Sequence, residues 1–81
     1  MLSSPDLKFI AKEMGISFGD VGFLFWKNET KEIQQTVIRI LNEEKEYKKN
    51  NDSRFNPERY DMADNILVEL LAELVSVPKP E

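Results

Sequence analysis

The chain has 81 residues, enough for one small domain, and its 41% apolar and 32% charged residues are typical of a sequence that folds. It has no cysteine and no histidine, which excludes disulfides and thiolate metal sites and leaves zinc sites and nucleophile–base pairs without their usual residues. The net charge of −4 falls on residues 55–81, which hold two basic and six acidic residues. Residues 1–54 hold nine of each and have no net charge. Neither part therefore has the excess of basic residues that phosphate binding needs.

The first third of the chain predicts two helices joined by a tight turn. Ser4-Pro5-Asp6 begins the first helix, with Ser4 as N-cap, and Gly15 ends it in a left-handed conformation. Ser17 caps a shorter second helix that runs to about Lys27. The apolar stripe expected of this second helix comprises Phe18, Val21, Leu24 and Phe25.

A third, longer helix is predicted to begin at residues 28–30. We expect it to fray through residues 44–51, EKEYKKNN, which read as a solvated charge run. Residues 48–53, KKNNDS, then read as a flexible linker. One face of the third helix holds Ile33, Val37, Ile40, Leu41 and Tyr47.

A fourth helix is predicted from Asn56-Pro57-Glu58, and Pro78 and Pro80 end it. The fold class that follows is all-α: a compact three-helix domain, residues 1–54, with a fourth amphipathic helix, within residues 55–81, packed in its groove. One half of this fourth helix is apolar and forms the docking face, which comprises Tyr60, Ala63, Ile66, Leu67, Leu70, Leu71 and Leu74.

The sequence offers no set of residues for catalysis. The acids are spread over solvated faces, no glycine-rich phosphate loop is present, and no nucleophile has a base beside it. No apolar run approaches the ~20 residues of a membrane span. We therefore expect no enzyme activity, no cofactor, no metal and no membrane partner, in an intracellular protein.

Residues 10–21 fit the helix-turn-helix pattern, with Ala11 as its small residue and Gly15 in its turn. Reading DNA requires polar or basic side chains on the outward face of the second helix. Here that face holds an acid that phosphates repel, and aromatic rings that cannot read base edges. We expect no direct DNA binding, and a degenerate helix-turn-helix domain remains an alternative.

Four large apolar side chains fall off the predicted core stripes. Either a later segment covers them as part of the core, or they form a groove for the amphipathic helix of a partner protein. The physical argument leaves both open. The predicted partner-binding groove comprises Phe9, Phe23, Trp26 and Ile38.

Residues 21–36, VGFLFWKNETKEIQQT, resemble the C-terminal (RCT) domain of the telomeric repressor-activator protein Rap. The shared pattern is a Val, an aromatic-rich turn, Lys-Asn, an acid and a Thr before the next apolar stripe, and it covers roughly residues 3–48. The resemblance implies a nuclear protein-docking domain that recruits Rap to chromosome ends, for telomere length control, end protection and silencing. It would do so by binding a helix of a TRF-type protein that itself binds telomeric repeats.

Residues 56–81 resemble the other side of that interaction, the Rap-binding motif of a TRF/Taz-like protein. The resemblance therefore implies a monomeric chain that joins an RCT domain to its own binding motif. One alternative is a natural four-helix domain whose last helix closes the bundle. Another is a death-fold-like assembly domain, suggested by residues 6–21 and 63–74, although death folds need six helices and four are predicted.

Overall fold

The computed structural model describes residues 2–75, with side chains described as far as residue 72. The all-α prediction is confirmed: this part of the chain forms helices and contains no strand. The predicted end of the last helix at Pro78 and Pro80 lies outside the described residues. The helices are α1 (Ser4–Met14), α2 (Phe18–Trp26), α3 (Lys31–Lys49) and α4 (Pro57–Val75).

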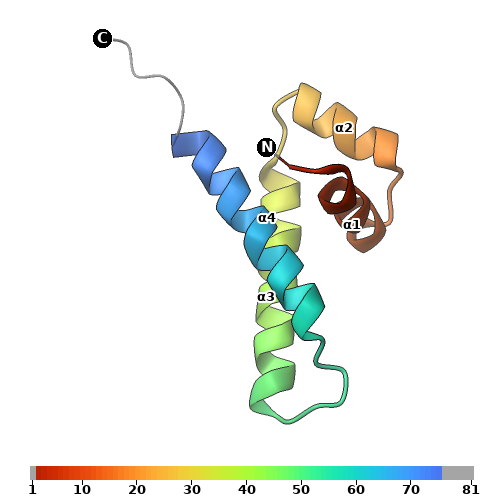
Figure 1. Ribbon diagram of the computed structural model, residues 1–81. Coiled ribbons are helices and arrows are strands. Elements are labelled where there is room, and N and C mark those ends of the chain that lie inside the picture. Colours follow the sequence, from red (N-terminus) through yellow and green to blue (C-terminus); the bar gives the residue numbers. More distant parts are fainter. Residues whose placement is uncertain (1, 76–81) are drawn as a thin grey trace.

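The two long helices α3 and α4 form an antiparallel pair that crosses near its middle (Figure 1). The short helices lie beside the N-terminal half of α3, where α1 packs against both α2 and α3. The loop between α3 and α4 therefore lies at the end of the molecule away from α2. This arrangement leaves one side of α2 and one side of α4 facing outward.

Local hydrogen bonds fix the two short helices. Ser3, and not the predicted Ser4, is the N-cap of α1, because its N–H and its hydroxyl both donate to the Asp6 carboxylate at 3.1 and 2.9 Å. Gly15 ends α1 with φ of 70°, as predicted. Ser17 caps α2 by accepting from the Asp20 N–H at 3.1 Å, also as predicted.

The end of α3 differs from the sequence expectation. Most of residues 44–51 are exposed, as expected of a solvated charge run. The helix nevertheless continues to Lys49, so the expectation that it frays through this run was wrong. The reason is that its buried face extends to Glu44 and Tyr47. Asn51, with φ of 52°, then stops the helix, and the Asp52 N–H donates to the Tyr47 carbonyl at 2.8 Å. The Arg54 guanidinium, 4.6 Å from the Tyr47 ring centroid, further orders the predicted flexible linker.

One continuous apolar core joins all four helices. The prediction that Phe18 belongs to the stripe of α2 was wrong: Phe18 is the first residue of this short helix, lies at the rim of the core, and is half exposed. Leu7, Leu24 and Phe25 pack against the core and are only partly buried. The buried members are Ile10, Ala11, Val21, Ile33, Val37, Ile40, Leu41, Ala63, Ile66 and Leu70.

Two isoleucines of α3 give a matched test of this core. Ile40 is 0% exposed and Ile38 is 46% exposed. We expect Ile40→Ala to lower the free energy of unfolding by about 3 kcal/mol, since it leaves a cavity, and Ile38→Ala to lower it by less than about 1 kcal/mol. Urea unfolding followed by circular dichroism measures both. Equal losses would contradict the burial described here.

Candidate helix-docking site

The predicted docking face of α4 is largely the face that the structure buries. Ala63 and Ile66 are completely buried and Leu70 almost so. Tyr60 and Leu67 are partly buried against the same core. Leu71, also predicted for this face, lies at its edge and is half exposed, and the side chain of Leu74 lies outside the described residues.

The surface that receives α4 consists mainly of α3, with α1 beside it. Ile33, Val37 and Ile40 of α3 are completely buried and belong to the same cluster as Ile66 and Leu70 of α4. The small side chain of buried Ala63 suits a close approach of the two helices, since a larger one would have to displace packed neighbours. Burial of this apolar stripe supplies the main attraction between α4 and the rest of the chain.

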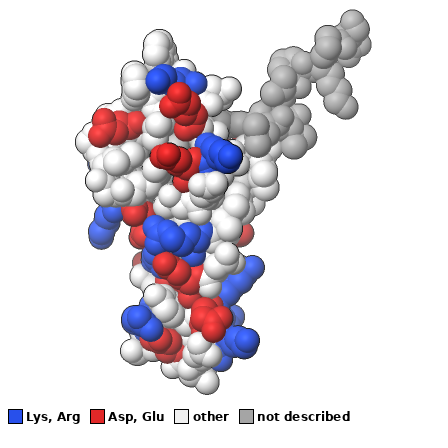
Figure 2. Space-filling view, turned by 180° about the vertical axis from the view of Figure 1, so that it is seen from behind, with Lys and Arg blue, Asp and Glu red and all other residues white. Residues whose placement is uncertain are grey.

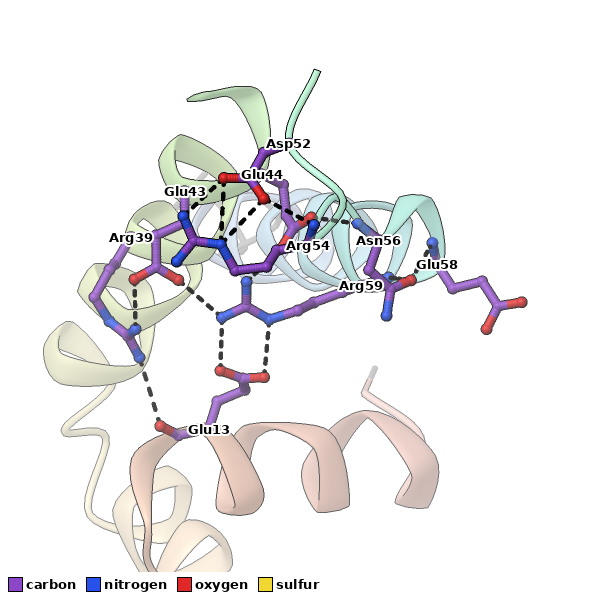
Figure 3. A network of polar contacts seen from close by, with 9 residues as sticks. All are labelled: Glu13, Arg39, Glu43, Glu44, Asp52, Arg54, Asn56, Glu58 and Arg59. Carbon is purple, nitrogen blue, oxygen red and sulfur yellow. Dashed lines mark hydrogen bonds and ion pairs between the residues drawn. The ribbon is translucent and has the colours of Figure 1, made fainter. Parts of the chain in front are cut away.

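A polar anchor accompanies this apolar contact at the first turn of α4 (Figure 3). The guanidinium of Arg59 donates to three glutamates: twice to Glu13 of α1 at 2.9 and 3.0 Å, once to Glu43 of α3 at 2.9 Å, and once to Glu44 of α3. The paired bonds to Glu13 form the bidentate geometry that a guanidinium makes with a carboxylate. A single side chain therefore ties α4 to both α1 and α3. We call Arg59, Glu13, Glu43 and Glu44 the arginine anchor.

Glu44 is the most enclosed member of the arginine anchor, with 1% of its side chain exposed. Its two carboxylate oxygens are both occupied, one by Arg59 and the other by the backbone N–H of Asn56 at 2.7 Å. A buried carboxylate without such partners would cost several kcal/mol. Asn56 also caps α4, because its side-chain oxygen accepts from the N–H groups of Glu58 and Arg59 at 3.0 and 3.2 Å. Glu44 thus fixes the place where α4 begins.

The arginine anchor changes the acid–base properties of its members. Hydrogen bonds from Arg59 lower the pKa of Glu13 below its ordinary value of 4.5, against the opposing effect of burial. A further hydrogen bond from Arg59 lowers the pKa of Glu43, which Arg39 also contacts at 3.0 Å. The pKa of Arg59 is raised, first by its hydrogen bonds to Glu13. Glu13, Glu43 and Arg59 therefore remain charged at neutral pH.

The arginine anchor was not predicted from the sequence, although the sequence contains two signals of it. Glu44 lies four residues after Ile40 and seven after Val37, so it falls on the apolar face of α3. Arg59 lies in the first turn of α4, where the helix dipole disfavours a positive charge. A buried acid and a misplaced base on neighbouring helices indicate a pair. The partners could not be matched without the crossing of α3 and α4.

The four residues predicted as a partner-binding groove lie in different surroundings. Phe23 and Trp26 lie together on the outer side of α2, 53% and 81% exposed, and α4 does not cover them. Phe9 is partly buried against the core and lines a shallow pocket beside Arg59 and Met62 of α4. Ile38 is half exposed on α3. The structure therefore places α4 on the buried face of α3 and leaves the α2 aromatics uncovered.

Charged side chains of both signs are interspersed over the surface (Figure 2). The view in the figure shows no continuous basic area of the kind that tracks a nucleic-acid backbone. Among the described residues, no group of acidic side chains is arranged to hold a metal ion, and no helix is both long and apolar enough to cross a membrane.

Comparisons of the chain with protein-family models, with curated proteins and with solved structures found no match. The resemblance to the RCT domain of Rap therefore rests on the sequence pattern of residues 21–36 and its surroundings.

Removing the positive charge of the arginine anchor should change how stability depends on pH. We expect Arg59→Met to lower the free energy of unfolding by about 3 kcal/mol at neutral pH, because it leaves Glu44 buried without a cation. The lowered pKa values of Glu13 and Glu43 mean that their contribution is complete above about pH 4.5 and is lost as the pH falls through those values. The difference between wild type and variant should therefore shrink as the pH falls below about 4.5, measured by urea unfolding.

Arg54→Met is the matched control for this prediction. The Arg54 side chain is 69% exposed and pairs with Asp52 at 2.7 Å in the loop, which lowers the pKa of Asp52 to about 2. An ion pair this exposed is screened by solvent and contributes little to stability, so Arg54→Met should lower the free energy of unfolding much less than Arg59→Met does. Losses of equal size for Arg54→Met and Arg59→Met at neutral pH would contradict a special role for the arginine anchor.

Proposed function

We propose that the protein is a protein-interaction module in which residues 1–54 hold an amphipathic helix in the way that they hold α4. The observation that carries this proposal is the one-sided attachment of α4. Ala63, Ile66 and Leu70 form a single buried stripe, and Asp61 and Asp64 on the other side are exposed. A helix in a groove is recognised by anchors at this spacing.

The geometry of the arginine anchor supports the same proposal. Protein interfaces commonly combine an apolar stripe with a few charged groups, and arginine is enriched among residues that dominate binding. Arg59 fills this role, because its partners Glu13, Glu43 and Glu44 all lie outside α4. Residues 1–54 therefore offer an apolar face and an acidic socket to one helix.

The resemblance to Rap gives the proposal its specific form. In that form, residues 1–54 act as an RCT domain in the nucleus and residues 56–81 stand for the helix of a TRF/Taz-type protein that binds telomeric repeats. The module would then recruit Rap to chromosome ends, where telomere length control, end protection and silencing take place. The sequence pattern of residues 21–36 supports this setting.

Cutting the chain between residues 54 and 56 tests the proposal. A peptide of residues 56–81 should be mostly disordered alone, because a single helix lacks tertiary support, and should become helical in a one-to-one complex with residues 1–54. Leu70→Asp should abolish association by placing an unpaired charge in the apolar stripe. Calorimetric titration and circular dichroism measure both effects. Asp64→Ala, on the exposed side of α4, is the control and should bind as wild type does.

Failure of reassembly would decide against the proposal. A 1–54 fragment that stays unfolded in a large excess of peptide would make α4 an integral fourth helix of one closed domain. The telomeric form has a separate test, since the Rap-binding helix of a TRF-type protein should displace the 56–81 peptide from residues 1–54. If the two fragments reassemble but the TRF-type helix does not displace the 56–81 peptide, the proposal of a docking module stands and its telomeric form is rejected.

Direct binding to duplex DNA is the other function that the sequence leaves open. Residues 1–54 have no net charge and α2 presents Asp20, Phe23 and Trp26 outward, so we expect no binding that weakens with salt. Fluorescence anisotropy with labelled telomeric and unrelated duplexes at low and high salt measures this. Tight binding at low salt that falls steeply as salt rises would revive the helix-turn-helix interpretation.

A further inference from the structure

The outer face of α2 carries exposed apolar side chains that the docking of α4 does not use. Val21 is the only fully buried residue of α2, and the opposite side carries Phe23 and Trp26, which are 53% and 81% exposed. At about 100° per residue, these two aromatics share their side of the helix with Gly19 and Gly22. We call these four residues the α2 outer face.

The two aromatic rings of the α2 outer face stack on each other and form a ridge. The ring centroids of Phe23 and Trp26 lie 6.0 Å apart with 26° between their planes, a stacked arrangement. The ammonium group of Lys27 lies 5.2 Å from the centroid of the Phe23 ring. A ridge that is ordered before binding loses less conformational entropy when a partner covers it.

Among the described residues, no side chain packs closely against the two glycines beside this ridge. A Cβ atom at Gly22 would meet no heavy atom within 4 Å, and one at Gly19 would meet only the Ser17 hydroxyl at 3.9 Å. Neither glycine has a positive φ, unlike Gly15. Glycine in a helix is less favourable than alanine by up to about 1 kcal/mol. These glycines therefore leave room for the close approach of another surface, and none of the described residues uses it.

We infer that the α2 outer face binds the same face of a second copy of the chain, with the two α2 helices antiparallel. Phe23 and Trp26 are three residues apart, and so are Gly19 and Gly22. An antiparallel pair therefore places Trp26 of each copy over Gly19 of the other while Phe23 lies over Gly22. The face fits itself across a two-fold axis, which is the geometry of an isologous dimer.

The charges of α2 favour the same arrangement. Asp20 and Lys27 are the charged residues from Phe18 to Lys27, and they lie two helical turns apart on one side of the helix. In the antiparallel pair, Lys27 of each copy lies alongside Asp20 of the other. A parallel pair would place like charges level with one another. Antiparallel packing also sets the positive end of each helix dipole beside the negative end of the other.

The dimer is weak, because a face on one nine-residue helix is smaller than the ~800 Å² per partner of a standard interface. We expect a dissociation constant of about 0.1–1 mM, in the range of transient contacts. Since α4 leaves Phe23 and Trp26 exposed, this dimer does not depend on the function proposed above.

Gly22→Ala in the full chain is the decisive variant. It should raise the melting temperature, since alanine favours the helix and its Cβ meets nothing, and it should weaken dimerisation at least tenfold, since the Cβ blocks the approach of Phe23. The concentration dependence of the Trp26 indole N–H signal in NMR spectra measures association. A variant that melts at a higher temperature and yet dissociates more readily cannot be explained by a loss of folding.

Two further measurements test the antiparallel orientation. Lys27→Glu should weaken dimerisation. Lys8→Glu makes the same change of charge at an exposed position of α1 and should leave dimerisation unchanged. In a mixture of isotope-labelled and unlabelled chains, the Trp26 ring of one copy should show a nuclear Overhauser contact to the Gly19 Hα of the other. A wild-type chain that stays monomeric at millimolar concentration, or a Gly22→Ala chain that dimerises as wild type does, would overturn the proposal.

Discussion

One buried carboxylate constrains the arrangement of the helices more than any other group. Glu44 lies on the apolar face of α3, where an uncompensated charge would cost several kcal/mol. Arg59 and the backbone N–H of Asn56 compensate it, and both belong to the start of α4. Because Arg59 also binds Glu13, the compensation of one charge determines where α1, α3 and α4 meet. A shift of α4 by one turn would bring a larger residue to the buried place of Ala63, and it would also break the hydrogen bonds of the arginine anchor.

The second short helix stands apart from this constraint. α2 contributes Val21 to the buried core and no residue to the arginine anchor. Leu24 and Phe25 pack against that core, whereas Phe23 and Trp26 are exposed as a stacked pair. The chain thus separates two kinds of contact: a helix held by a buried stripe and a charged anchor, and an uncovered aromatic ridge beside two glycines.

Sequence patterns predicted the elements and their inward faces, because caps and 3.6-residue periodicity act locally. The caps at Gly15, Ser17 and Asn56 and the stripe of Ala63, Ile66 and Leu70 follow from such patterns. Features that depend on tertiary contacts were not predictable in this way. The burial of Glu44 within the otherwise exposed charged run was not predicted, because no local rule shows that Arg59 would lie against Glu44. The surroundings of Phe9, Phe23, Trp26 and Ile38 also depend on how the helices cross. All four lie off the predicted core stripes, but this does not mean that they line one groove.

The location of the arginine anchor at the first turn of α4 has a mechanical consequence. Since α3 and α4 are antiparallel and joined by a short loop, a force that separates the two ends of the chain acts first on the C-terminal part of α4 (Figure 1). The helix would come away from α3 turn by turn, and the ion pairs beside the loop would break last. A force applied at the start of α4 would instead load the ion pairs and the apolar stripe together. The same interface would therefore resist pulling more strongly from one end than from the other.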